Sequence, residues 1–230
     1  MDTLFWFRRD LRLFSNEALI QALNNGAKHA IFFVSEKQWQ QHQAAPIQID
    51  LLKRRVTYLQ SQLADYGITL HIIEAPSFCD CTRELINFCK ANDVKHVIAN
   101  TEYELNEVNR DKAILHECDE LSITFTLYEG DLIAPVGTVK NQSNEMYKVF
   151  TPFKRAWLKQ YQDTHFSLPQ WPLTSDPIKF DESDLLKSDG CSDKWPVDDD
   201  TLSTVVDNFI CDKLTSYDDQ RDIPSVKGTS

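Results

Sequence analysis

Glycine is scarce in this sequence. Only six of the 230 residues are glycine, and neither a G-x-G-x-x-G pattern nor a P-loop follows the first apolar run. Those loops need glycine because their backbone N–H groups approach nucleotide phosphates closely. The segment 8–12, RRDLR, stands where such a loop would be. The sequence therefore excludes a dinucleotide fingerprint, and any cofactor has to be held mainly by side chains.

Cysteine pairs and long apolar runs are also missing. None of the six cysteines forms a C-x-x-C pair or lies near a histidine at metal-finger spacing, so we expect reduced thiols and no metal site. No stretch approaches the roughly 20 apolar residues of a membrane span. The apolar run at the start is too short for a signal peptide. We expect a cytoplasmic protein that does not associate with membranes.

Basic residues are outnumbered, and the net charge is −11. Residues 176–230 contain 14 acidic and 6 basic residues, a net of −8, which leaves −3 for residues 1–175. An acidic surface repels nucleic-acid phosphates. The main DNA-binding face of any DNA-binding protein is thus not expected on this chain.

The first 130 residues alternate between short apolar runs and segments with helical spacing. Continuous runs such as LFWF and AIFFV are typical of strands buried on both faces. The alternation predicts a Rossmann-like, doubly wound α/β fold with a five-stranded parallel sheet and helices on both faces. The expected strands are 4–7, 30–34, 69–74, 96–100 and 123–128, and the expected helices are 16–23, 46–66, 80–92 and 104–120.

The chemistry of such a fold is expected at the carboxyl ends of its strands. The loops that follow Phe7, Val34 and Asn100 are therefore the candidate ligand-binding loops. Arg8, Asp10 and Arg12 follow a buried strand, where unpaired charges would be costly, so we interpret them as a structural ion-pairing set.

The rest of the chain divides into three further parts. Residues 131–168 form a helical extension of the 1–130 domain, and residues 169–200, rich in proline, serine and aspartate, are interpreted as an exposed interdomain linker. Residues 201–217 resume a helical pattern with one apolar face. Too little chain follows to bury that face. Residues 201–230 are therefore interpreted as the first helix of an all-α domain, cut short.

Four stretches together resemble the DNA photolyase/cryptochrome family, and most closely the bacterial cyclobutane-dimer photolyases. They are WFRRDLRLFSNEAL at 6–19, NTEYELNEVNRD at 100–111, EMYKVFTPFKRAWL at 145–158 and YDDQRDIPSVKGTS at 217–230. The resemblance implies an antenna domain followed by a helical domain that binds FAD and DNA. In such proteins, light absorbed by the antenna reaches reduced FAD, which donates an electron to a pyrimidine dimer.

The resemblance also implies residue roles. Asn106 and Glu107 match the pair that hydrogen-bonds the pterin of the antenna 5,10-methenyltetrahydrofolate, and His42 matches a histidine beside it. A carboxylate and an amide suit the edge of a 2-amino-4-oxopterin. A structural alternative is that Glu107 only occupies a helix first turn, where the dipole favours acids.

A second set of residues matches positions near FAD and DNA. Tyr217, Thr229 and Ser230 match residues near the FAD, and Arg221 matches an arginine that faces DNA phosphate. In this chain alone we expect Arg221 to pair with Asp218 or a neighbouring aspartate. No catalytic residue is expected here. The 230 residues are expected to form a monomer without repair activity of its own, and the whole protein is expected to act on damaged DNA.

Two other functions remain open at this stage. One is a cryptochrome-type flavin photoreceptor, because the residues that separate signalling from repair are not among these 230. The other is a stand-alone pterin- or nucleotide-binding module, in which an oligomer partner would cover the helix at 201–217. The antenna itself could be a deazaflavin or a flavin instead of folate.

Overall fold

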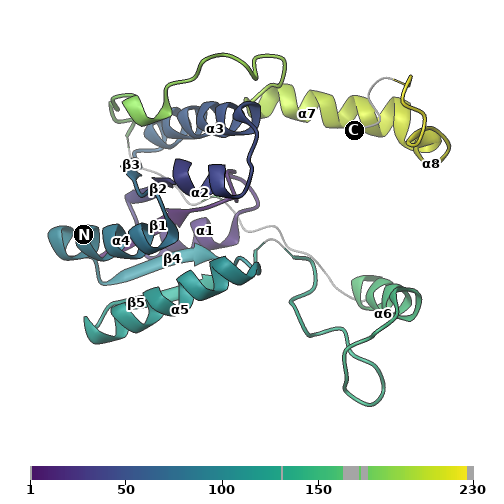
Figure 1. Ribbon diagram of the computed structural model, residues 1–230, viewed down its shortest axis with the longest axis horizontal. Coiled ribbons are helices and arrows are strands. Elements are labelled where there is room, and N and C mark those ends of the chain that lie inside the picture. Colours follow the sequence, from purple (N-terminus) through teal and green to yellow (C-terminus); the bar gives the residue numbers. More distant parts are fainter. Residues whose placement is uncertain (1, 131, 163–170, 172–175, 227–230) are drawn as a thin grey trace.

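The computed structural model describes residues 2–130, 132–162, 171 and 176–226. Its centre is a parallel five-stranded sheet in the order β3-β2-β1-β4-β5 (Figure 1). The strands are β1 (Thr3–Phe7), β2 (His29–Val34), β3 (Thr69–Glu74), β4 (His96–Asn100) and β5 (Thr124–Tyr128). The main helices are α1 (Glu17–Asn24), α2 (Glu36–Gln41), α3 (Pro46–Asp65), α4 (Phe78–Asn92), α5 (Leu105–Glu120), α6 (Phe150–Gln162) and α7 (Asp199–Asn208).

Helices cover both faces of the sheet, as the strand alternation requires. The side chains of Phe5 and Phe7 point to the face covered by α1 and α3, and those of Leu4 and Trp6 point to the face covered by α4 and α5. All four are almost completely buried, which is why β1 reads as an uninterrupted apolar run. The predicted doubly wound α/β fold is confirmed.

Two segments differ from the sequence-based expectation. A short helix, α2, forms where a loop was expected after β2, and it buries none of its residues. Residues 176–199 were expected to form an exposed linker, and most of them are exposed, but they also run along α3 and include a short 3₁₀ turn (Asp184–Leu186). Leu186 is 4% exposed and Ser192 is 0% exposed, so this segment is partly a packed element.

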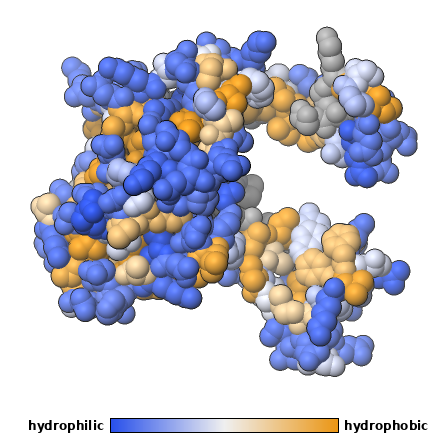
Figure 2. Space-filling model, in the orientation of Figure 1, coloured by the Kyte–Doolittle hydropathy of each residue, from blue (hydrophilic) through white to orange (hydrophobic). Residues whose placement is uncertain are grey.

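The helices at the end of the chain extend away from the sheet. Figure 1 shows α6 and α7 projecting from the α/β layers, and neither helix buries a residue. After α7 come a π-helical turn (Phe209–Lys213), a 3₁₀ turn (Leu214–Ser216) and α8 (Tyr217–Gln220). Figure 2 shows apolar surface over both projecting parts. None of the helices in the described ranges is long and apolar enough to cross a membrane.

Candidate functional site

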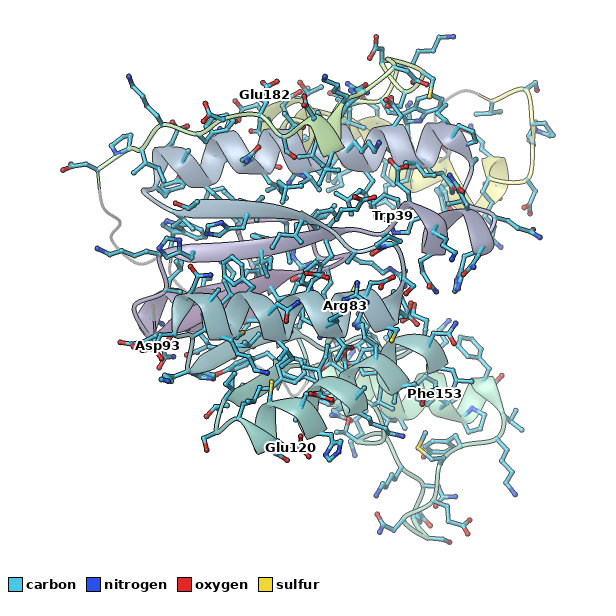
Figure 3. All side chains as sticks on the ribbon, turned by 60° about the vertical axis from the view of Figure 1, so that its left-hand side comes forward. Trp39, Arg83, Asp93, Glu120, Phe153 and Glu182 are labelled. Carbon is cyan, nitrogen blue, oxygen red and sulfur yellow. The ribbon has the colours of Figure 1, made fainter. Side chains whose placement is uncertain are left out.

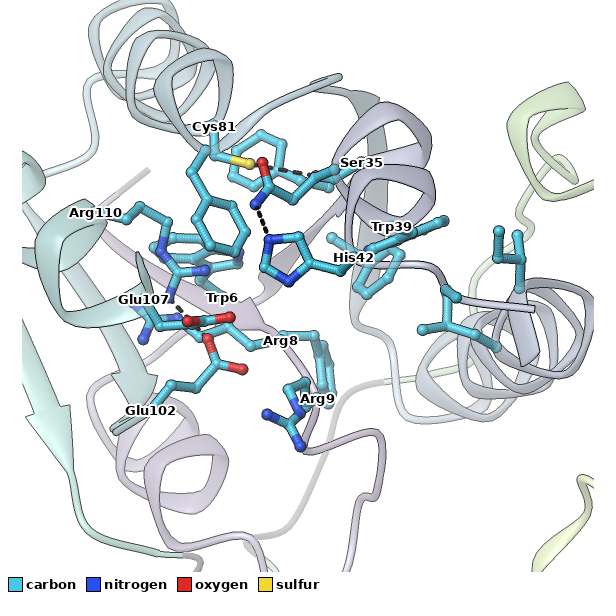
Figure 4. Close-up of a pocket in the computed structure, with 18 of the residues that line it drawn as sticks. Trp6, Arg8, Arg9, Ser35, Trp39, His42, Cys81, Glu102, Glu107 and Arg110 are labelled. Atoms are coloured by element: carbon cyan, nitrogen blue, oxygen red, sulfur yellow. Dashed lines mark hydrogen bonds and ion pairs between the residues drawn. The ribbon is translucent and has the colours of Figure 1, made fainter. Parts of the chain in front are cut away.

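A cavity of about 480 Å³ opens at the carboxyl end of the sheet. Residues that directly follow β1, β2 and β4 line it, among them Arg8, Ser35 and Glu102 (Figure 4). Strands β1 to β3 follow one another toward one edge of the sheet, and β4 and β5 are added on the other side of β1, so the topological switch point lies between β1 and β4. Ligands of doubly wound sheets bind at this place. The cavity therefore matches the position predicted from the strand pattern.

Six aromatic residues contribute to the walls of the cavity, beside nine polar or charged ones. The sheet contributes the rings of two strands, α2 contributes Trp39, and the start of α4 contributes Phe78. The N-terminal turns of α3 add Gln48, Ile49 and Leu52. The aromatic residues that line the cavity are Trp6, Phe7, Phe32, Phe33, Trp39 and Phe78. Flat aromatic faces of this kind gain free energy by stacking on a planar ligand.

A buried network of four charges forms the base of the cavity. The guanidinium of Arg8 donates to both carboxylate oxygens of Asp111, at 2.8 and 3.0 Å. Arg110 donates to Glu102 at 2.8 Å and to Asp111 at 3.0 Å. All four residues are at most 8% exposed. Two positive and two negative charges balance, which makes their burial tolerable.

Both arginines also stack on the ring of Trp6. The guanidinium carbon lies 4.0 Å from the ring centroid for Arg8 and 4.7 Å for Arg110. Burial lowers the pKa of Arg8, and the neighbouring positive charge of Arg110 lowers it further. For Arg110, burial is outweighed by the carboxylates of Asp111 and Glu102, which raise its pKa. The interpretation of Arg8 as a structural ion-pairing residue is confirmed.

Asp10 is likewise held within the fold. Its carboxylate accepts hydrogen bonds from the backbone N–H of Arg8 at 2.9 Å and from the side-chain amides of Asn16 and Asn100. Asn16 in turn caps α1 by accepting from the backbone N–H of Leu19. These contacts tie the loop after β1 to the end of β4, so they fix the position of the cavity floor.

The predicted antenna residues lie at two adjoining hollows. Glu107, in the first turn of α5, lines the aromatic cavity, and so does His42, which directly follows α2 (Figure 4). Asn106 lines a neighbouring hollow of about 890 Å³ beside α4 and α5. The two hollows share four lining residues, namely Gln38, His42, Phe78 and Arg110. A ligand that contacted all three predicted residues would have to span both hollows.

Several residues of the site were not singled out from the sequence. Gln38 bonds to His42 with their nitrogen atoms 2.9 Å apart, and Trp39 forms part of the wall. Gln38 and Trp39 lie on α2, a helix of six residues that has no apolar periodicity from which it could be predicted. Glu102 and Arg110 lie within a quoted motif. They pair with each other, and the network reaches the end of β1 through Asp111, which pairs with Arg8 across 103 residues, a contact that spacing alone does not reveal.

The residues predicted to lie near FAD and DNA are outside this site. Tyr217 begins α8, where its ring contacts Phe209 edge-on at 5.7 Å. Thr229 and Ser230 lie outside the described residues. Arg221 is exposed and pairs with Asp218 at 3.5 Å, and with the following aspartate at 3.8 Å, as expected for the isolated chain. The FAD and DNA roles of these residues stay predictions.

Fold and cavity define an α/β domain with a cavity at the switch point of its parallel sheet. The chain belongs to the DNA photolyase family, whose pattern it matches over residues 3–173. It is 33% identical to the deoxyribodipyrimidine photo-lyase of Vibrio cholerae, over 99% of this chain and 50% of that protein. With the enzyme of the same name from Escherichia coli it shares 31% identity, over 99% of this chain and 49% of that protein.

Solved structures show the same fold. A bacterial class III photolyase from Agrobacterium tumefaciens superposes with a TM-score of 0.76 and 23% identity, covering 99% of this chain and 48% of that one. A cryptochrome from Synechocystis superposes with a TM-score of 0.68 and 20% identity, covering 96% of this chain and 48% of that one. The chain spans about half the length of the curated relatives it matches.

Proposed function

We propose that this chain is the light-harvesting domain of a photolyase that repairs cyclobutane pyrimidine dimers, with 5,10-methenyltetrahydrofolate as its antenna. The observation that carries the proposal is the position of Glu107 and His42. Both line an aromatic cavity at the switch point of a fold shared with the photolyases. The division into an antenna domain, a linker and the start of a helical domain is part of this proposal, as are a monomeric state and a cytoplasmic location.

The chemistry of Glu107 fits the pterin part of this ligand. Its carboxylate lines the cavity, and the two oxygens of a carboxylate can accept from adjacent N–H groups of a 2-amino-4-oxopterin. Its place in the first turn of α5 favours a negative charge through the helix dipole. Asn106 would then reach the same ligand from the adjoining hollow. When bound, the folate supplies the absorption of light, and the protein residues orient its ring.

The repair step itself is assigned to the whole protein. There, reduced FAD would donate an electron to a pyrimidine dimer in DNA after light has been absorbed by the antenna. Tyr217, Thr229 and Ser230 are proposed to contribute to the FAD site, and Arg221 to the DNA contact. The 230 residues alone are proposed to lack repair activity, because none of their residues is assigned to catalysis.

A flavin is the second candidate antenna. The aromatic lining of the cavity favours it, because an isoalloxazine ring is also flat and gains from stacking. Signalling by a cryptochrome-type receptor is compatible with the same domain. No residue of the cavity distinguishes signalling from repair.

Binding of methenyltetrahydrofolate to the purified chain tests the proposal. Substituting Glu107→Gln keeps the size of the side chain but removes the charge that would strengthen two hydrogen bonds. We expect the free energy of folate binding to weaken by about 1.5–3 kcal/mol, which raises Kd roughly 10- to 150-fold. Glu120→Gln, an exposed residue at the other end of α5, is the matched control and should bind like the parent chain. The measurement is a fluorescence titration with the folate and, in parallel, with FMN.

The outcomes separate the candidates. Equal folate affinity in the parent and Glu107→Gln chains would remove Glu107 from the pterin site. Binding of FMN without binding of folate would replace the folate antenna by a flavin. If neither probe binds, the cavity is not an antenna site in this chain.

A further inference from the structure

Residues 176–199, here called the strap, are fastened to α3 through Asp50. One carboxylate oxygen of Asp50 accepts from the hydroxyl of Ser188 at 2.5 Å and from the backbone N–H of Asp189 at 3.1 Å. The other accepts from the backbone N–H and the hydroxyl of Ser192, at 2.9 and 2.5 Å. Asp50 is 5% exposed and Ser192 is 0% exposed. Four donors from the strap thus converge on one buried carboxylate.

The next turns of α3 continue this attachment. Arg54 donates to the carbonyl of Ser192 at 2.6 Å and to that of Trp195 at 3.2 Å. Arg55 donates to the carbonyl of Val197 at 2.5 Å and pairs with Asp199, the first residue of α7, at 2.7 Å. These bonds fix the backbone of the strap up to the point where α7 begins.

The C-terminal half of α3 holds the beginning of the strap. The carbonyl of Ala64 accepts from the backbone N–H of Ile178 at 2.9 Å, and Gln60 donates to the carbonyl of Asp181 at 3.5 Å. Residues 178–192 therefore run antiparallel to α3, and residues 192–199 turn back along the helix. Figure 3 shows it over the side of the helix that faces away from the sheet, with Glu182 marking its path. Its proline- and aspartate-rich composition suggested a solvated linker, but these long-range hydrogen bonds order it.

A metal site is a competing explanation for this cluster. Ligand atoms of Asp50, Asp189 and Cys191 lie within 4.8 Å of one another. Each oxygen of Asp50, however, already accepts two hydrogen bonds. The Cys191 thiol is kept protonated because its contact with Asp189 raises its pKa to about 11. Burial disfavours the charge of Asp50, yet the bonds from Ser188 and Ser192 hold its pKa well below the usual range. The hydrogen bonds from the strap therefore explain why Asp50 can be buried and charged, without a metal ion.

We propose that Asp50 is a positioning residue that holds the strap in one register on α3 and thereby fixes where α7 begins relative to the cavity. The cavity shares this helix, because Gln48, Ile49 and Leu52 line it from the same turns that carry Asp50. A polypeptide joined after α7 would thus start from a fixed place beside the ligand-binding cavity. This role does not depend on which ligand the cavity binds.

Distances measured by pulsed dipolar EPR test the proposal. One spin label is placed on Cys79, which is exposed on α4, and a second on Lys194→Cys in the strap, with Cys191 and Cys211 changed to serine. We expect one narrow distance distribution in this parent chain. Asp50→Asn should broaden it into several distances, whereas Asp184→Asn, an exposed strap residue paired with Lys187, should leave it unchanged.

Hydrogen exchange supplies a second readout. The amides of Asp189 and Ser192 should exchange roughly ten-fold faster or more in Asp50→Asn, the loss expected when a bond to a charged group is removed. If Asp50→Asn fails to fold, the paired substitution Ser188→Ala with Ser192→Ala removes two donors and keeps the carboxylate. A narrow distribution in a folded Asp50→Asn chain or in the serine variant, or a broad one in the parent chain, would overturn the proposal.

Discussion

At the scale of single residues, each of the four buried charges beneath the cavity needs its partners for the fold to be stable. Asp111 accepts hydrogen bonds from both Arg8 and Arg110, so its negative charge is shared by two buried guanidinium groups. Changing Asp111→Asn leaves two buried positive charges facing only Glu102. We expect the free energy of unfolding to fall by about 3–5 kcal/mol, as when one partner of a buried ion pair is removed. Urea unfolding followed by circular dichroism measures this loss.

An exposed ion pair provides the matched comparison. Arg9 pairs with Glu104, but their side chains are 68% and 50% exposed. Glu104→Gln should therefore change the free energy of unfolding by at most about 1 kcal/mol. Similar losses in Asp111→Asn and Glu104→Gln would show that the buried network does not carry the stability assigned to it.

At the scale of secondary structure elements, β2 and β3 bring two histidines together. Nδ1 of His29 and Nε2 of His71 lie 3.1 Å apart, and their rings stack at 5.3 Å. Burial lowers the pKa of both, and for His29 nearby positive charge, including Lys28, lowers it further. The folded chain therefore binds these protons less readily than the unfolded chain, in which a histidine has a pKa of about 6.5.

The sign of the pH dependence follows from these lowered values. The contribution of the pair is fully present above pH about 6.5 and is lost as the pH falls below it, because the unfolded state then binds more protons. The free energy of unfolding should thus decrease between pH 7.5 and 5.5, and His71→Gln should make the decrease smaller. His116→Gln, an exposed site on α5, should keep the parental slope. Urea midpoints at the two pH values decide between these slopes, and parallel curves for both variants would contradict the assignment to His71.

The elements also show which parts of the structure the sequence can predict. Strands such as β1 and helices such as α3 have apolar runs or stripes that their burial demands, so local pattern predicts them. α2 has six residues and buries none, and therefore leaves no such pattern. The strap is ordered by Asp50, which lies 138 to 142 residues away from its partners. Contacts at that separation depend on the finished fold, so composition alone predicted the exposure of the segment but not its attachment to α3.

The candidate site also has a part that the sequence predicts and a part that it does not. Glu107 and Asn106 could be located because they lie in a quoted motif that follows the fourth strand, and the strand order places that loop at the switch point. The division of the two residues between adjoining hollows could not be foreseen. It arises because successive residues of a helix point in directions about 100° apart, so only the packing of α4 and α2 decides which hollow each side chain enters.

At the scale of the whole molecule, packing is concentrated in the α/β layers. Leu59 on α3 is 0% exposed within the core, whereas Leu214, after α7, is 51% exposed. Short helices without tertiary packing are marginal in water. The region from α7 to α8 should therefore add little to the cooperative unfolding of the chain, although the strap fixes its starting point.

Two identical substitutions test this division of stability. Leu59→Ala should lower the free energy of unfolding by about 2–5 kcal/mol, because it removes a buried side chain and leaves a cavity. Leu214→Ala should change it by no more than about 0.5 kcal/mol, as is usual for surface positions. Urea unfolding monitored by tryptophan fluorescence gives both values in one series. Equal losses would mean that the C-terminal helices fold as one cooperative unit with the sheet, and that the strap transmits stability as well as position.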